Sequence, residues 1–327
     1  MNVSVTGGGG FIGGLLLEAL SARGDSVRWL SRRSMNQSVP GCTVGNLVDD
    51  SDSLDGFVAD CEVVYHCAGE LKSPELMYDL HVNGTANLLA AVQRQIARTG
   101  RPVHWVQLSS TGAYGALSQR SIIDESFRPS PEGDYEVTKT ISDALVEAFA
   151  KCEPLFSYTI VRPSIVIGER MPNRSFFQLA NMVRRKLFFY IGDRNTNRST
   201  YVHVNDVVRA LIACGNDPRA RGNTFLLSSD CRQVELIHAM ASYAGVPAPR
   251  MGMPEGLLRW LLRCVPASIK LPLTLERIDA LTKKGGYDTG HIQRVLDFRF
   301  ERPLPRCIAD VLSGEVQAGT NEKSEQA

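Results

Sequence analysis

A glycine-rich loop near the N-terminus constrains the fold of this chain more than any other feature. Thr6-Gly7-Gly8-Gly9-Gly10-Phe11-Ile12-Gly13 lies between a β-branched run, residues 2–6, and a segment of helical period, residues 11–23. Glycines at such a junction let the backbone turn tightly and approach a pyrophosphate at the helix N-terminus. A purely structural turn also requires glycine. The position of the loop directly after a first strand nevertheless predicts a dinucleotide-binding site.

The rest of the chain alternates short β-branched runs with longer segments of helical period. This alternation is typical of βαβ units in a parallel sheet. It predicts an α/β fold with a Rossmann-type, doubly wound parallel sheet. The predicted strands are residues 2–6, 26–30, 62–66, 103–109, 159–165 and 224–228, and the predicted helices are residues 11–23, 80–98, 135–151 and 205–214.

The alternation breaks after Gly168, and Pro- and Leu-rich helical segments replace it from about residue 246. We therefore expect two structural units, the second a smaller C-terminal substrate lobe. The polar C-terminal segment lacks aromatic residues, and we expect a disordered tail there. The expected parts are a dinucleotide-binding domain of residues 1–168 and 200–230, a substrate-binding lobe of residues 169–199 and 231–313, and a tail of residues 314–327.

Composition excludes several classes of protein. The chain has 327 residues, 43% of them hydrophobic and 22% charged, which is typical of soluble globular proteins. Its net charge of +1 argues against a dedicated nucleic-acid-binding protein. The eight cysteines form no CxxC motif and no cluster with metal-ligand spacing, so we expect reduced thiols and no metal site. The N-terminus shows no secretory signal pattern, and we expect a cytoplasmic protein.

The end of the second predicted strand bears on the choice of cofactor. A site for NAD usually places a carboxylate there, which binds the ribose 2′-hydroxyl. This chain has Arg32 and Arg33 instead. Because guanidinium groups suit a 2′-phosphate, we expect NADP to be favoured over NAD. The alternative interpretation is a pair of solvated surface arginines.

Tyr135 and Lys139 lie four residues apart in a predicted helix, so their side chains lie on one face, one turn apart. A cation beside the phenol favours the phenolate and predicts a tyrosine pKa below the ordinary value of about 10. Such a tyrosine suits proton exchange with a substrate hydroxyl. Ser110 follows the fourth predicted strand, at the sheet edge where ligands gather. The alternatives are a common surface pair and a Ser/Thr-rich structural turn.

Together these motifs resemble the extended short-chain dehydrogenase/reductase family, in its nucleotide-sugar epimerase and dehydratase group. The similar segments occur in the same order along most of the chain. They are the TGxxGxxG loop at residues 6–13, His66-Cys67-Ala68-Gly69, Asn83-Gly84-Thr85-Ala86-Asn87, Ser110, the YxxxK pair Tyr135 and Lys139, residues 161–168 and residues 201–206.

The resemblance implies hydride transfer between a substrate carbinol carbon and C4 of a nicotinamide. In this family pattern Tyr135 would be the acid and base, Lys139 would hold the nicotinamide ribose, and Ser110 would orient the substrate oxygen. The resemblance also implies a homodimer that pairs residues 80–98 and 135–151. The implied cofactor contacts are Gly7, Gly10, Phe11, Ile12, Gly13, Arg32, Arg33, Asn46, Leu47, Cys67, Ala68, Gly69, Tyr135, Lys139, Pro163 and Ile165.

Several positions depart from the family pattern. His81 stands where the family often has asparagine, which puts a proton-relay or helix-distorting role there in doubt. Thr111 and Gly112 stand where 4,6-dehydratases carry the acidic pair that eliminates water, so dehydration is disfavoured. Ile165 replaces a frequent asparagine, and Asn46 replaces an acid that often binds the adenine.

Positive charge is concentrated in the predicted substrate lobe. Residues 170–200 contain seven basic residues and one acidic residue. This concentration suits a diphosphate group and predicts a nucleotide sugar as the small-molecule substrate, although a solvated basic face would have the same composition. Arg198 and Arg174 are the candidate phosphate contacts. Glu70 and Thr111 are weaker candidates, and for Glu70 an ordinary loop carboxylate is the favoured interpretation.

Two alternative functions stay open at this point. One is a hydroxysteroid-dehydrogenase-like or ketone reductase activity on an apolar substrate. The other is a regulatory protein that binds NADP without turnover, against which the intact set of Ser110, Tyr135 and Lys139 argues. Residues 257–265 are apolar with Arg259 and Arg263 on one side. We expect a helix packed on the lobe, and a membrane-surface helix is the disfavoured alternative.

Overall fold

A seven-stranded parallel sheet lies at the centre of the computed structural model, which describes residues 1–32, 41–49, 51–115, 121–264 and 274–313. The strand order is β11-β7-β5-β4-β1-β2-β3, so the chain moves outward from β1 in one direction and then returns to fill the other side. This topology confirms the predicted doubly wound Rossmann-type fold. The strands are β1 (Asn2–Thr6), β2 (Ser26–Ser31), β3 (Cys42–Val44), β4 (Val63–His66), β5 (Val103–Leu108), β7 (Phe156–Pro163) and β11 (Asn223–Leu227).

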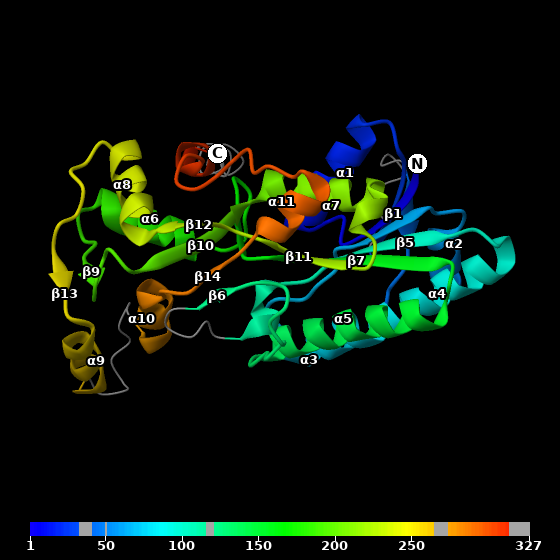
Figure 1. Ribbon diagram of the computed structural model, residues 1–327, viewed down its shortest axis with the longest axis horizontal. Helices are drawn as coiled ribbons and strands as arrows, with labels where there is room; N and C mark the ends of the chain where they lie inside the picture. The colour runs from blue at the N-terminus through cyan, green and yellow to red at the C-terminus, as the bar shows by residue number, and fades with distance from the viewer. Residues whose placement is uncertain (33–40, 50, 116–120, 265–273, 314–327) are drawn as a thin grey trace, which may run out of the picture.

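Helices cover both faces of this sheet (Figure 1). On one face, α1 (Phe11–Ala22) and α7 (Val204–Asn216) bury Leu16 and Leu211 against the strands. On the other face, Leu88 and Val146 belong to a second core cluster. The helices of that second layer are α2 (Ser51–Val58), α4 (Gly84–Thr99) and α5 (Asp134–Cys152).

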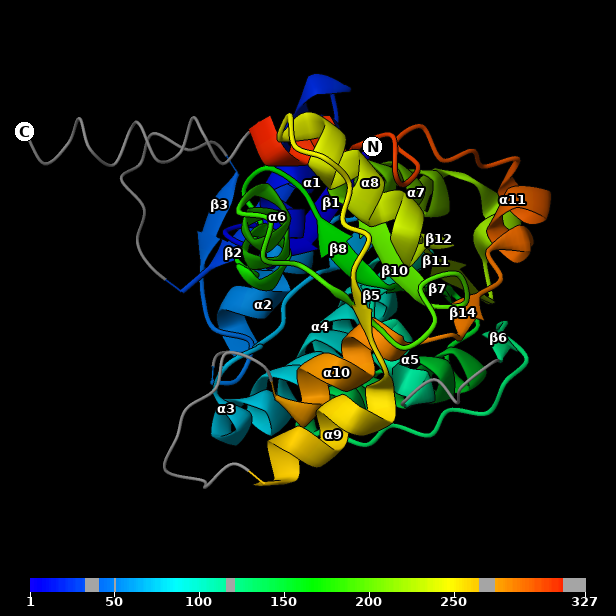
Figure 2. The same ribbon diagram turned by 90° about the vertical axis from the view of Figure 1, so that its left-hand side faces the viewer.

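Most of the remaining elements lie beyond the carboxyl ends of the central strands, whereas α11 packs on β11 in the core cluster shared by α1 and α7. Figure 2 looks onto this end of the molecule, with α6, α8, α9 and α10 toward the viewer. A three-stranded sheet of β12, β10 and β8 joins the two regions. The elements are β6 (Ile122–Ile123), β8 (Ile165–Ile167), α6 (Ser175–Arg184), β9 (Tyr190–Ile191), β10 (Arg198–His203), β12 (Ser229–Arg232), α8 (Gln233–Tyr243), β13 (Gly252–Met253), α9 (Glu255–Cys264), α10 (Leu275–Thr282), β14 (Gly286–Tyr287) and α11 (Gly290–Leu296).

The predicted single strand at residues 159–165 is wrong in one respect. β7 ends at Pro163, and β8 begins at Ile165 in a different sheet. Between them, the Ser164 amide donates a hydrogen bond to the Leu227 carbonyl oxygen at 2.8 Å. Pro163 has no N–H to continue the ladder, and the chain changes sheets directly after it. This break brings β8 beside β10 at the carboxyl edge of the central sheet.

Two predictions concern residues that the structure does not describe, Arg33 and the tail at residues 314–327. Each cysteine whose side chain is described is a free thiol. Within the described ranges, no helix combines the length and the apolar character that crossing a bilayer would require.

The glycine-rich loop turns tightly between β1 and α1. Gly7 has a φ of +70°, and a Cβ there would lie 2.7 Å from the Cys67 carbonyl carbon. A Cβ at Gly13, in the first turn of α1, would overlap the Gly7 carbonyl oxygen. A Cβ at Gly9 would have no atom within 4 Å. The loop is therefore packed tightly on its inner side and open at Gly9.

Gly13→Ala tests this packing. Alanine normally stabilises a helix relative to glycine, but here the added methyl group must displace backbone atoms. We expect the free energy of unfolding to fall by about 1–3 kcal/mol. Gly9→Ala is the matched control and should change it by less than about 0.5 kcal/mol. Chemical denaturation of both variants without cofactor measures the difference, and equal stabilities would contradict the close contact.

Candidate active site

Lys139 lies in the second turn of α5 and is only 3% exposed. Among the described residues, its Nζ has no hydrogen-bond or ion-pair partner. Burial lowers the pKa of Lys139, and the Asp143 carboxylate one turn further along the helix opposes this effect. A buried ammonium without a protein partner can bind hydroxyl groups of a ligand.

Tyr135 lies one turn before Lys139 in the same helix. Burial raises the pKa of the Tyr135 phenol to about 12, and the negative charges of Glu136 and Asp143 act in the same direction. The sequence-based prediction of a lowered pKa is therefore wrong for this structure. Helical spacing shows the neighbouring cation, but it does not show that desolvation of the phenol is the larger effect.

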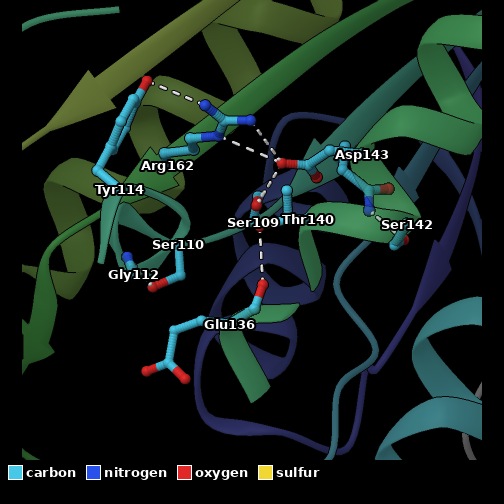
Figure 3. Close-up of polar contacts among 10 residues, drawn as sticks. Ser109, Ser110, Gly112, Tyr114, Glu136, Thr140, Ser142, Asp143 and Arg162 are labelled. Carbon is cyan, nitrogen blue, oxygen red and sulfur yellow. Dashed lines mark hydrogen bonds and ion pairs between the residues drawn. The ribbon is translucent and has the colours of Figure 1, made fainter. Parts of the chain in front are cut away.

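Ser110 begins a 3₁₀ turn, Thr111–Tyr114, at the carboxyl end of β5. Its Oγ accepts a hydrogen bond from the Gly112 amide at 3.1 Å, which leaves the hydroxyl hydrogen for another acceptor. A Cβ on Gly112 would lie 2.5 Å from Glu136 Cγ, so this turn packs directly on the first turn of α5 (Figure 3). The structure thus brings the elements that carry Ser110 and Tyr135 together.

A buried ion pair, which sequence reasoning missed, supports this corner of the sheet (Figure 3). Arg162, on β7, donates from Nη2 and Nε to Asp143 Oδ2 at 3.0 and 3.2 Å. Ser109 Oγ donates to the same oxygen at 2.7 Å, and Arg162 Nη1 donates to the Tyr114 hydroxyl at 2.9 Å. The only sequence signals were the spacing of Asp143, four residues after Lys139, and the arginine within residues 161–168.

The helix that precedes α4 is distorted at the position of His81. A π-helical turn, Asp79–Asn83, separates α3 (Pro74–Tyr78) from α4. His81 is 1% exposed, and its Nε2 accepts a hydrogen bond from the Glu70 amide at 2.9 Å. The distortion is therefore present although histidine stands in place of the asparagine frequent in the family.

His81 also contacts helix α5. Because Nε2 accepts a hydrogen bond, Nδ1 carries the hydrogen and donates it to Thr138 Oγ1 at 2.8 Å. The His81 ring lies edge-on to the Tyr135 ring at 5.5 Å. Burial lowers the pKa of His81 to about 4, so the ring is neutral at physiological pH. We interpret His81 as a residue that positions the N-terminal turns of α5.

The predicted dinucleotide contacts surround the carboxyl ends of β1, β2 and β4. Thr6 Oγ1 accepts a hydrogen bond from the Ala68 amide at 3.2 Å, which holds Cys67-Ala68-Gly69 beside the glycine-rich loop. Phe11 and Ile12 form the first turn of α1. The open side of the loop, the free N-terminus of α1 and the unpartnered Lys139 ammonium fit a bound dinucleotide.

The other predicted cofactor residues lie on the loops around this edge. Arg32 is exposed directly after β2 and lies near enough to Glu70 to help lower its pKa, although backbone hydrogen bonds contribute more. The Asn46 amide donates to Asp49 Oδ2 at 2.6 Å. Leu47 is buried, and its carbonyl oxygen accepts from the Asn87 amide group. Pro163 ends β7, and Ile165 is 52% exposed in β8.

The four candidate substrate residues are not brought into one cavity. Arg198 lines a cavity of about 340 Å³ with Arg232 and Lys284. Arg174 lies over the Phe177 ring in a different cavity of about 570 Å³, between α6 and α8.

Glu70 and Thr111 have partners within the protein. Glu70 Oε1 accepts hydrogen bonds from the amides of the next three residues, at 3.0, 2.8 and 3.3 Å, as expected for an ordinary loop carboxylate. Thr111 is buried and lies close enough to the Tyr287 hydroxyl to oppose the rise that burial causes in the pKa of Tyr287. In the described part of the chain, no group of three or more His, Cys, Asp or Glu side chains is arranged to hold a metal ion.

A doubly wound sheet with a glycine-rich first loop, and a Tyr-Lys pair on the helix beside it, define an NAD(P)-dependent enzyme of the short-chain dehydrogenase/reductase type. Residues 3–227 match the model of the NAD dependent epimerase/dehydratase family. The chain belongs to this family, which confirms the resemblance seen in its motifs.

Relatives of the chain include both epimerases and reductases. It is 23% identical to a UDP-glucose 4-epimerase of Vibrio cholerae, over 97% of this chain and 96% of that protein. It is 29% identical to a ketoreductase of Stigmatella aurantiaca that acts on a farnesylated dihydroquinoline oxide, over 72% of this chain and 70% of that protein. A short-chain dehydrogenase/reductase superfamily structure from Agrobacterium tumefaciens with bound NAD shares the fold, with a TM-score of 0.73, 18% identity and coverage of 99% and 100%.

Glu136→Gln tests the electrostatic environment of Tyr135. Removing this carboxylate stabilises the phenolate relative to the phenol, so the pKa of Tyr135 should fall. We expect the alkaline limb of the pH profile for the reductive direction to move to lower pH. The measurement is the rate of NAD(P)H oxidation against pH. Glu132→Gln, an exposed carboxylate in the preceding loop, is the control, and an alkaline limb that stays in place in both variants would contradict the assignment.

Proposed function

We propose that this enzyme transfers a hydride between C4 of NADP and a secondary alcohol or ketone carbon of a nucleotide sugar, as an epimerase or as a dehydrogenase/reductase. The observation that carries the proposal is the meeting of two elements at the carboxyl edge of the sheet. One is the turn that begins with Ser110, and the other is the helix that carries Tyr135 and the unpartnered Lys139.

The side chains have distinct roles in this proposal. The bound nicotinamide supplies or accepts the hydride. In the reductive direction the protonated Tyr135 phenol donates its proton to the carbonyl oxygen of the substrate, and in the oxidative direction the phenolate accepts the hydroxyl proton. Ser110 donates a hydrogen bond to the same oxygen. Lys139 binds the nicotinamide ribose, and the nearby Asp143 helps to keep Lys139 charged.

The basic cavity supports an anionic substrate. Arg198, Arg232 and Lys284 line it, and Arg232 is paired with Glu235 at 2.7 Å. Arg198 Nε is buried and has no hydrogen-bond partner among the described residues. The volume of about 340 Å³ is within the range of small-molecule sites, about 300–1,000 Å³. We infer that Arg198 and Lys284 bind the diphosphate, as suits a relative of a UDP-glucose 4-epimerase.

The proposal includes the organisation of the molecule. The dinucleotide-binding part would comprise residues 1–168 and 200–230, and the other elements would close over the substrate. The proposal also includes a homodimer that forms through α4 and α5. Val137 and Ile141, one turn apart on α5, are each 36% exposed and supply apolar surface for such an interface. A cytoplasmic location remains part of the same proposal.

A second candidate is the reduction of an apolar ketone. The raised pKa of Tyr135 keeps the phenol protonated, which suits proton donation during net reduction. The related ketoreductase, whose substrate carries a farnesyl group, is consistent with this reaction. The two candidates use the same side chains and differ in the substrate.

Tyr135→Phe tests catalysis together with the substrate class. We expect turnover to fall by about 10²–10⁴-fold, because the variant has no phenolic proton, while NADPH binding is retained. The assay follows NADPH absorbance with oxidised nucleotide sugars, steroid ketones and dihydroflavonols, and chromatography of UDP-sugars detects epimerisation. Tyr243→Phe, on the exposed side of α8, is the control. Unchanged turnover in Tyr135→Phe would favour a protein that only binds the cofactor.

Arg32→Ala tests the cofactor preference. A charge-assisted hydrogen bond contributes about 1.5–3 kcal/mol, so NADPH affinity should fall about tenfold or more. NADH lacks the 2′-phosphate, and its affinity should change little. Fluorescence titration with both cofactors measures this difference, with Arg101→Ala as an exposed control. Equal losses for NADH and NADPH would show that Arg32 does not recognise the phosphate.

A further inference from the structure

Helix α9 is apolar on two opposite sides and uses only one of them for packing. Leu258 is 7% exposed and contacts Ile191 and Ile278 in a small core cluster, with Leu262 beside it. On the other side, Leu257, Trp260 and Leu261 are 48%, 60% and 41% exposed. Their spacing of three and four residues places them on one face of the helix. The expected packing on the lobe is therefore present, but it leaves a second apolar face that the described residues do not cover.

Two further exposed apolar side chains lie on the segments that lead into β9 and β13. Met251, directly before β13, is 78% exposed, and Leu187, which precedes β9, is 61% exposed. The Tyr190 amide donates to the Met251 carbonyl oxygen at 2.9 Å, which joins the two segments. Figure 1 shows β9, β13 and α9 together at one end of the molecule. We call Leu187, Met251, Leu257, Trp260 and Leu261 the distal apolar surface.

The two chain segments that carry the distal apolar surface are rich in basic residues. Residues 182–194 and 246–264 contain seven basic residues and only two acidic ones, Asp193 and Glu255. Glu255 is paired with Arg259 at 2.9 Å, and Asp279 of α10 is paired with the same arginine at 2.5 Å. The exposed basic side chains of these segments are Arg184, Arg185, Lys186, Arg194 and Arg250.

We propose that the distal apolar surface docks onto a membrane that contains anionic lipids. Helix α9 would lie in the plane of the bilayer surface, with Leu257, Trp260 and Leu261 at the boundary between headgroups and acyl chains. Tryptophan prefers this boundary, and the exposed arginines and lysines of the two segments would contact the anionic headgroups.

The charges favour a membrane over a second copy of the chain. Two copies that met through this surface would bring segments of like charge together, whereas an anionic lipid surface neutralises them. The proposal does not depend on the proposed function, since α9 carries none of the catalytic residues. It concerns where the enzyme works and leaves its reaction unchanged.

The tryptophans of the chain provide a direct test. There are three, and Trp29 and Trp105 are 7% and 0% exposed, so lipid contact changes the emission of Trp260. The full-length protein is mixed with vesicles of phosphatidylcholine and phosphatidylglycerol. We expect a blue shift, quenching by lipids brominated on their acyl chains, and weaker binding at higher ionic strength. Vesicles of phosphatidylcholine alone should bind less.

Leu261→Asp removes one apolar contact and adds a negative charge at an exposed position, so the fold should be unaffected. Vesicle binding, measured by co-sedimentation, should fall by about tenfold or more. Leu155→Asp, a similarly exposed leucine just before β7, is the matched control, and thermal unfolding shows whether both variants are folded.

Three outcomes would overturn the proposal. The first is Trp260 emission that does not change with anionic vesicles, and the second is binding that Leu261→Asp leaves intact. The third is a blue shift that appears without vesicles as the protein concentration rises, because it would show that a second copy covers the surface. None of these outcomes bears on hydride transfer, which the assays of Tyr135→Phe examine separately.

Discussion

The burial of the Lys139 ammonium is the constraint on which the active-site corner depends. A buried cation is costly unless nearby negative charge compensates it. Asp143 provides that charge from the next turn of α5. Burial raises the pKa of Asp143 itself, and Arg162 and the Ser109 hydroxyl oppose this rise. Tyr114 accepts a further hydrogen bond from Arg162. Helix α5, β7 and the turn after β5 are thereby held together by charge as well as by apolar packing.

A second buried network connects the cofactor loop to the same helix. Thr6 Oγ1 bonds to His66 Nδ1 at 2.8 Å, and His66 Nε2 bonds to Thr85 Oγ1 at 3.1 Å. Thr85 Oγ1 contacts Ser142 Oγ at 2.8 Å, and the Gln107 amide donates to Ser142 at 2.8 Å. The hydrogen bonds run without a break from the end of β1 to α5. These buried side chains therefore hold the glycine-rich loop in position relative to the helix that carries Tyr135 and Lys139.

The sequence predicted the parts of this site that depend on local pattern. The Gly7-to-Gly13 loop and the Tyr135/Lys139 spacing are visible because each occupies one short segment. The roles of His81 and Arg162 were not predictable, since their partners Thr138 and Asp143 lie 57 and 19 residues away. The prediction of a lowered pKa for Tyr135 was wrong for the same reason, because the desolvation that raises this pKa arises from the whole fold. The break after Pro163 was not predictable either, because it arises when the following residues pair with β10 in a different sheet.

The basic residues outside the central sheet occur in two settings, one in a cavity and one on the exposed surface. This difference argues for two kinds of anion. Arg198 lines a cavity, and its buried Nε has no hydrogen-bond partner in the part of the chain that the structure describes, so it suits a small anion that enters the cavity. Arg185, Lys186 and Arg250 are exposed in the segments that lead into β9 and β13, where a small anion would remain hydrated and exchange freely. An extended anionic surface gains from several such charges together and from the apolar contact between them. Recessed and exposed basic residues in one lobe are thus compatible with a phosphorylated substrate in the cleft and lipid headgroups outside it.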